Sequence, residues 1–132
     1  MHRTLILAVT LSLLAAGASH AGEWVKLGER NVGFISDHDK IEVGRHDGKF
    51  KRLRLRVHRN DIELNSIHIV FGNGEVERIK FEEHIRQGGE SPVINLSTPW
   101  RDGRFIREVE LHYHSRPDLR GEAVAELWGQ ED

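Results

Sequence analysis

The chain has 132 residues and no cysteine, and its 19 basic and 21 acidic residues give a formal net charge of −2. A chain of this length can bury one core of modest size. Without cysteine it has no disulfide, thiolate metal site or thiol nucleophile, and the near-neutral charge gives no electrostatic support for general nucleic-acid binding.

The first 21 residues are typical of a secretory signal peptide. Arg3 precedes an apolar run from Leu5 to Ala16, and Ser19-His20-Ala21 places small residues at the −3 and −1 positions of a cleavage site after Ala21. The apolar run is roughly 12 residues long, whereas a membrane-spanning helix needs about 20. The alternative is a buried N-terminal helix. We therefore expect a periplasmic or secreted protein with no membrane span, whose single domain comprises residues 22–132.

The remaining chain shows short apolar or alternating segments separated by turn residues. Candidate strands are 24–27, 32–35 (a weaker candidate), 41–43, 50–58, 62–71, 76–81, 93–96, 105–114 and 123–128. Asp47-Gly48 and Gly72-Asn73-Gly74 predict hairpin turns, and residues 82–92 and 97–104 predict loops. This spacing favours an all-β fold, an antiparallel β-sandwich (jelly-roll-like) of about eight strands.

One predicted strand changes phase in its middle. Ile62 and Leu64 alternate in one phase, and Ile67, Ile69 and Phe71 alternate in the other. A β-bulge at 65–66 would absorb one residue and keep both apolar sets facing the core.

A basic stripe follows the clearest strand, where Arg52, Arg54, Arg56 and His58 alternate with Leu53, Leu55 and Val57. Guanidinium groups on one face suit phosphate or acidic glycans. The alternative is a solvated sheet face. If the strand from Phe105 is the neighbour, its polar face would complete a ladder of cross-strand charge pairs. That face carries Glu108, Glu110, His112 and His114.

Two histidines share a strand face in His112-Tyr113-His114, a spacing that suits a transition metal if another strand supplies a third ligand. His38, within Asp37-His38-Asp39, is the candidate for that ligand. The alternative is that these are ordinary surface histidines. His68 falls on the polar phase of its own strand and is predicted to be simply exposed.

The loop from Pro99 to Arg104 places Trp100 beside Arg101 and Arg104. Tryptophan and arginine are enriched at binding hot spots, and an exposed indole can also stack on a sugar. Alternatively, Trp100 folds back and caps one end of the sandwich.

Several segments between Asp39 and Trp128 together resemble a known family pattern. They are 41–43, 52–55, 61–64, 67–74, 94–96, 106–111 and 123–129. This run is similar to a small periplasmic β-sandwich family of unknown function, the YaaI-like family. The resemblance implies an exported β-sandwich with no established activity, and it assigns no functional residues.

Catalytic signatures are missing from the sequence: no G-x-S-x-G is present, and no serine lies in a recognisable catalytic motif. The chain is therefore interpreted as a non-catalytic binding or envelope accessory module without a cofactor. Its expected partner is a glycan, an anionic envelope component or another protein. The alternatives are a cell-envelope hydrolase, which needs two carboxylates or a His-carboxylate pair in a cleft, and a histidine-based metal-binding protein.

Overall fold

The computed structural model describes residues 22–33, 38–97, 103–114 and 121–131, which form nine β-strands and one 3-10 helix. The strands are β1 (Trp24–Val32), β2 (His38–Glu42), β3 (Lys49–Phe50), β4 (Arg52–His58), β5 (Ile62–Phe71), β6 (Val76–Ile85), β7 (Ile94–Asn95), β8 (Arg104–His114) and β9 (Ala123–Gln130), and the helix η1 spans Arg45–Asp47. The all-β prediction is confirmed, with nine strands in these residues against an expected eight. Within them, no helix is long and apolar enough to cross a membrane.

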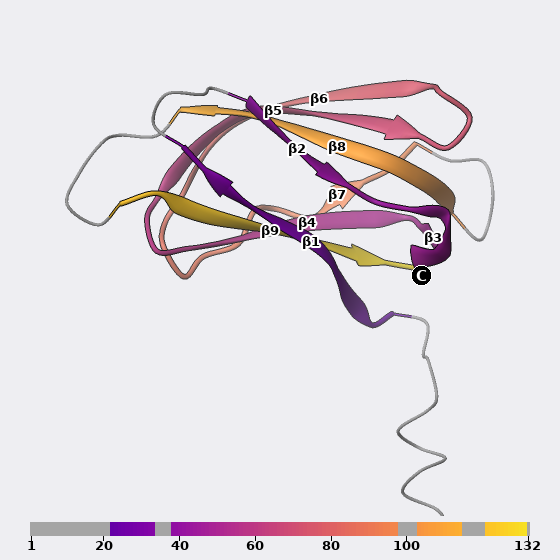
Figure 1. The fold of residues 1–132 in the computed structure, drawn as a ribbon, viewed down its shortest axis with the longest axis horizontal. Helices are drawn as coiled ribbons and strands as arrows, with labels where there is room; N and C mark the ends of the chain where they lie inside the picture. Colours follow the sequence, from indigo (N-terminus) through magenta and orange to yellow (C-terminus); the bar gives the residue numbers. More distant parts are fainter. Residues whose placement is uncertain (1–21, 34–37, 98–102, 115–120, 132) are drawn as a thin grey trace, which may run out of the picture.

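Two antiparallel sheets pack face to face, which confirms the predicted β-sandwich (Figure 1). The four-stranded sheet has the order β1-β9-β4-β7. The five-stranded sheet has the order β2-β8-β5-β6, with β3 also paired to β8. Strands β4 and β5 follow one another in sequence but belong to different sheets, so the chain crosses between the layers at residues 59–61.

Apolar side chains from alternate positions fill the space between the sheets. The predicted inward face of β4 is fully buried, with Leu53, Leu55 and Val57 at most 1% exposed. Opposite them lie buried residues of β5 and β8, among them Ile67 and Leu111. Because each buried aliphatic side chain contributes roughly 1.5–3 kcal/mol of transfer free energy, this core can stabilise the domain without a disulfide.

The predicted bulge in β5 is confirmed. The register of β5 shifts between Leu64 and Ser66 against both neighbours, β6 and β8. Leu64 and Ile67 are both 0% exposed although they lie an odd number of residues apart. The extra residue therefore keeps both halves of the strand facing the core.

The predicted Asp47-Gly48 hairpin is wrong. Strands β2 and β3, on either side of this dipeptide, both pair with β8 and not with each other. Between them, the turn of η1 and Gly48 at φ +106° lead the chain away from β8 and back to it, and the chain then continues antiparallel to the same strand. A dipeptide indicates a local turn, but it does not determine which strands pair after it.

The predicted 82–92 loop begins later than expected. Strand β6 continues to Ile85, because Glu83, His84 and Ile85 pair with the first residues of β5. Glu83 and His84 are exposed and Ile85 is buried, which is compatible with a strand at the edge of the sheet, where one face is solvated.

Candidate functional site

The arginines of the basic stripe lie on the outer face of the four-stranded sheet, and each already has a partner. Glu90 Oε2 lies 3.6 Å from Arg54 Nη2 and 3.4 Å from Arg56 Nε. Arg52 Nη1 donates to Gln130 Oε1 at 3.2 Å. Each arginine of the stripe is therefore engaged by a neighbouring side chain, and one carboxylate is shared by two of them.

The predicted charge ladder between this stripe and β8 is wrong, because β4 pairs with β9 and β7 while β8 belongs to the other sheet. Two tryptophans of the same sheet take part instead, Trp128 on the adjacent strand β9 and Trp24 on β1, one strand further away. The guanidinium carbon of Arg54 lies 4.3 Å from the ring centroid of Trp24, and that of Arg56 lies 5.4 Å from Trp128. Cation–π contacts and Glu90 thus replace the predicted ladder.

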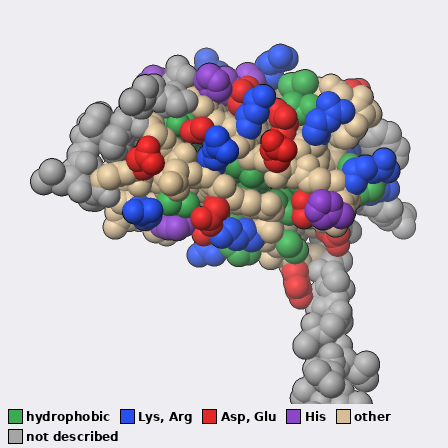
Figure 2. Space-filling view, viewed as in Figure 1, with side chains coloured by type: hydrophobic (Ala, Val, Ile, Leu, Met, Phe, Trp, Pro, Cys, Tyr) green, Lys and Arg blue, Asp and Glu red, His purple; other side chains and the backbone are tan. Residues whose placement is uncertain are grey.

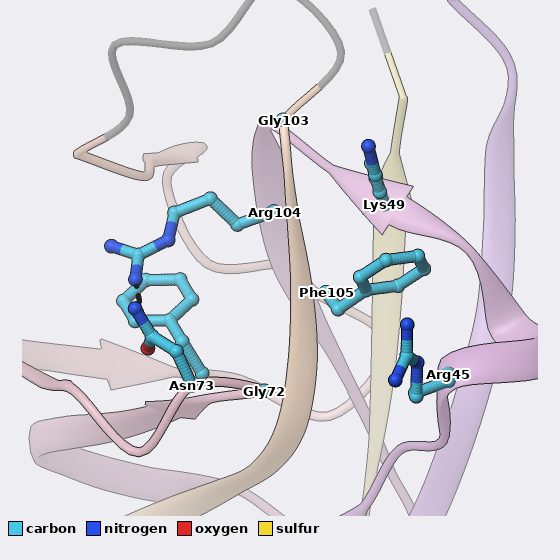
Figure 3. Close-up of a pocket in the computed structure, with 8 residues that line it drawn as sticks. Arg45, Lys49, Gly72, Asn73, Gly103, Arg104 and Phe105 are labelled. Carbon is cyan, nitrogen blue, oxygen red and sulfur yellow. Dashed lines mark hydrogen bonds between the residues drawn. The ribbon is translucent and has the colours of Figure 1, made fainter.

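A pocket of about 390 Å³ lies at the start of β8, beside β3 and the turn that joins β5 to β6 (Figure 3). Its lining side chains come from segments far apart in sequence. They are Arg45, Lys49, Phe71, Gly72, Asn73, Gly103, Arg104 and Phe105. Three of these residues, Arg45, Lys49 and Arg104, are basic and none is acidic.

One half of the pocket is built around the half-buried ring of Phe105. Arg45 and Lys49 lie on either side of it in Figure 3, with their cationic groups 5.0 Å and 5.3 Å from the ring centroid. The register of β3 against β8 places Lys49 directly opposite Phe105. Neither cation forms an ion pair with a carboxylate of the described residues.

The other half is held by Arg104, whose side chain is only 11% exposed. Its guanidinium carbon lies 3.6 Å from the ring centroid of Phe71, and Nη2 donates to Asn73 Oδ1 at 3.1 Å. Arg104 also pairs with Glu75. Hydrogen bonds from Asn73 and Arg104, together with the charge of Arg104, hold the pKa of Glu75 below its ordinary value. Arg104 is thus fixed in place, while Arg45 and Lys49 remain available.

Of the loop residues predicted from sequence to bind a ligand, Arg104 lines this pocket, while Trp100 and Arg101 lie outside the described residues. Sequence reasoning missed Lys49 and Phe105. The signal that identifies them is their cross-strand pairing, which no local pattern contains.

The predicted histidines separate into two groups. His38 lies directly across from His112 on β2, and their rings stack with centroids 5.7 Å apart. His114 lies apart from them, since its Nδ1 is 2.7 Å from Asn65 Nδ2. A second imidazole lies nearer to His112 than that of His38: the ring centroids of His68 and His112 are 4.3 Å apart. Figure 2 shows histidine side chains along the top of the view, over the five-stranded sheet.

Glu110 lies between these imidazoles. Its Oε1 is 3.0 Å from His112 Nε2 and 3.5 Å from His68 Nδ1. The hydrogen bond from His112 holds the pKa of Glu110 below its ordinary value. Burial lowers the pKa of His68, and His112 and Arg78 act in the same direction.

The family model described as "Domain of unknown function (DUF2541)" matches residues 5–129. No curated protein matches the chain. Among solved structures, AlgX of Pseudomonas aeruginosa is similar in fold, with a TM-score of 0.52 and 14% identity over 82% of this chain. The match covers 27% of AlgX, so this chain corresponds to about a quarter of that protein's length. At this identity the likeness shows the fold alone.

Proposed function

We propose that this chain, which belongs to the DUF2541 family, is a non-catalytic module that binds an anionic saccharide at the pocket beside the start of β8. One observation carries the proposal: the lining holds three basic residues and no acidic one. Two of these, Arg45 and Lys49, form no ion pair with a described carboxylate.

The chemistry of the lining favours a carboxylated sugar over a neutral one. A guanidinium and an ammonium group are matched to carboxylate oxygens. The half-buried ring of Phe105 lies between the two cations and positions them through cation–π contacts. A volume of about 390 Å³ lies within the range of small-ligand sites, roughly 300–1,000 Å³. The Asn73 amide already bonds to Glu75 and Arg104, which leaves one N–H of its nitrogen for a sugar hydroxyl.

The hydrolase alternative receives no support from this pocket. Glycoside hydrolysis requires two suitably spaced carboxylates, and none of the eight lining residues supplies one. A binding role requires only the cations, the aromatic ring and the amide.

Export to the periplasm or the medium is part of this proposal. It is supported by the leader-like pattern of residues 1–21. Mass spectrometry of the exported protein is expected to give a chain beginning at Gly22, and a chain retaining Met1 would contradict the proposal.

Isothermal titration of the purified protein with oligogalacturonate, and with a neutral oligosaccharide of equal length, tests the binding function. We expect binding of the carboxylated probe that weakens with added salt, because exposed charges are screened. In an Arg45→Gln/Lys49→Gln variant the affinity is expected to fall at least about tenfold, which corresponds to about 1.4 kcal/mol.

The matched control is Arg56→Gln. Arg56 also lies over an aromatic ring, but it is paired with Glu90 and lies outside the pocket. Its replacement is expected to leave the affinity unchanged. Equal binding of the neutral probe, or no loss of affinity in the double variant, would refute the proposal.

A further inference from the structure

Three side chains on the outer face of the five-stranded sheet form a compact group away from the pocket. His68 lies on β5, and Glu110 and His112 lie on β8. The register places His68 directly opposite Glu110. Their sequence neighbours Ile67 and Leu111 are both 0% exposed and face the core, so the pleat directs this group outward. None of the three lines the pocket.

The distances within this group fit metal coordination. A tetrahedral zinc site with bonds of about 2.0–2.1 Å places its ligand atoms roughly 3.3 Å from each other. Glu110 Oε1 lies 3.0 Å from His112 Nε2 and 3.5 Å from His68 Nδ1. All three ligand atoms lie within 4.8 Å of one another. Two of the three distances therefore match tetrahedral coordination, and the third, between the nitrogens of His68 and His112, is at most 4.8 Å.

The donor set selects the class of cation. Two imidazoles and one carboxylate suit zinc and other late first-row metals, whereas magnesium and calcium prefer oxygen ligands alone. We propose that His68, Glu110 and His112 bind one such divalent cation, with Zn²⁺ as the representative ion. Three protein ligands leave the fourth position open to water or to another ligand.

Some residues around this group favour cation binding and others oppose it. The side chain of Glu110 is 22% exposed, and those of His68 and His112 are 25% and 32% exposed, so a hydrated ion can reach all three. The ring of His38 stacks on His112 and restrains its orientation. Arg78 lies opposite His68 on β6 and repels a cation, while Lys40 on β2 is directed to Glu108, 3.6 Å away.

Titration of the purified protein, without a histidine tag and after removal of metals by a chelator, tests this assignment. With ZnCl₂ we expect one equivalent to bind per chain. In the His68→Ala/His112→Ala variant the Zn²⁺ affinity is expected to fall at least about tenfold. Replacing a residue that only orients a metal ligand already lowers metal affinity by about 10–100-fold, and these two residues are the ligands themselves. Glu110→Gln, which preserves the shape of the side chain, is expected to lose affinity in the same direction.

The control is His114→Ala. His114 lies two residues from His112 on the same strand, but its ring contacts Asn65, so Zn²⁺ binding is expected to be unchanged. Circular dichroism checks that each variant folds, and imidazole NMR resonances report which rings shift with the ion. Equal Zn²⁺ affinity in the wild type and the double variant, or loss of binding only in His114→Ala, would overturn the assignment.

Discussion

Replacing Gly103 with alanine is expected to destabilise the protein much more than the same replacement at Gly74. Both glycines have a positive φ, +88° and +92°, so alanine incurs a backbone cost of about 1–2 kcal/mol at either position. The space around them differs. A Cβ at Gly103 would lie 2.3 Å from the carbonyl oxygen and 2.5 Å from the carbonyl carbon of Phe50, whereas at Gly74 it would meet nothing within 4 Å.

The magnitude follows from that contact. The atoms in the way belong to the backbone of β3, so no side-chain rotation relieves the clash, and β3 must move away from β8. Overpacking of this kind costs about 1–3 kcal/mol. We therefore expect a loss of about 2–5 kcal/mol for Gly103→Ala and about 1–2 kcal/mol for Gly74→Ala. In a domain of this size each kcal/mol lowers the melting temperature by about 4 °C.

Urea unfolding of the two variants beside the wild type measures this difference, with the slope m checked for two-state behaviour. Gly103 precedes Arg104 and Phe105, so Gly103→Ala is also expected to weaken binding at the pocket, while Gly74→Ala leaves it intact. Equal destabilisation by the two replacements would show that the close approach of β3 and β8 contributes nothing, and would refute the reasoning.

Two further replacements test single interactions. The hydroxyl of Tyr113, which is 1% exposed, donates to Asp39 Oδ2 at 2.6 Å. Tyr113→Phe is therefore expected to lower the free energy of unfolding by about 1.5–3 kcal/mol, measured by urea unfolding. An unchanged unfolding midpoint would contradict this. Burial alone raises the pKa of Glu126, but hydrogen bonds from Trp128 and Lys26 and the charge of Lys26 bring it below its ordinary value. The contribution of Glu126 to the free energy of unfolding is therefore fully present above the pKa of a glutamate in the unfolded chain, about 4.3. It is lost as the pH falls through the lower pKa that Glu126 has in the folded protein. Glu126→Gln is expected to flatten stability against pH in this acidic range, and a profile like that of the wild type would argue against it.

The strand faces of this protein could be predicted from the sequence. Leu53, Leu55 and Val57 are buried as their alternation predicts, and the bulge lies where the apolar phase changes, between Leu64 and Ser66. These are local properties, because the pleat sends successive side chains to opposite faces whichever strand lies alongside.

The candidate sites depend on which strands pair, and that information is not local. The predicted charge ladder requires β4 to lie beside β8, but β4 belongs to the other sheet, and Glu90, Trp24 and Trp128 are the partners of its arginines. His68 carries no signal of its own as a metal ligand until β5 lies beside β8.

The sequence by itself therefore determined the inward faces of the strands and the all-β class, because alternation is a property of each strand's own backbone. Only the tertiary structure decided that Lys49 meets Phe105 and that His68 meets Glu110. Strand order and register are chosen by the packing of the whole core, and a charge or an imidazole on an outer face has little influence on that choice.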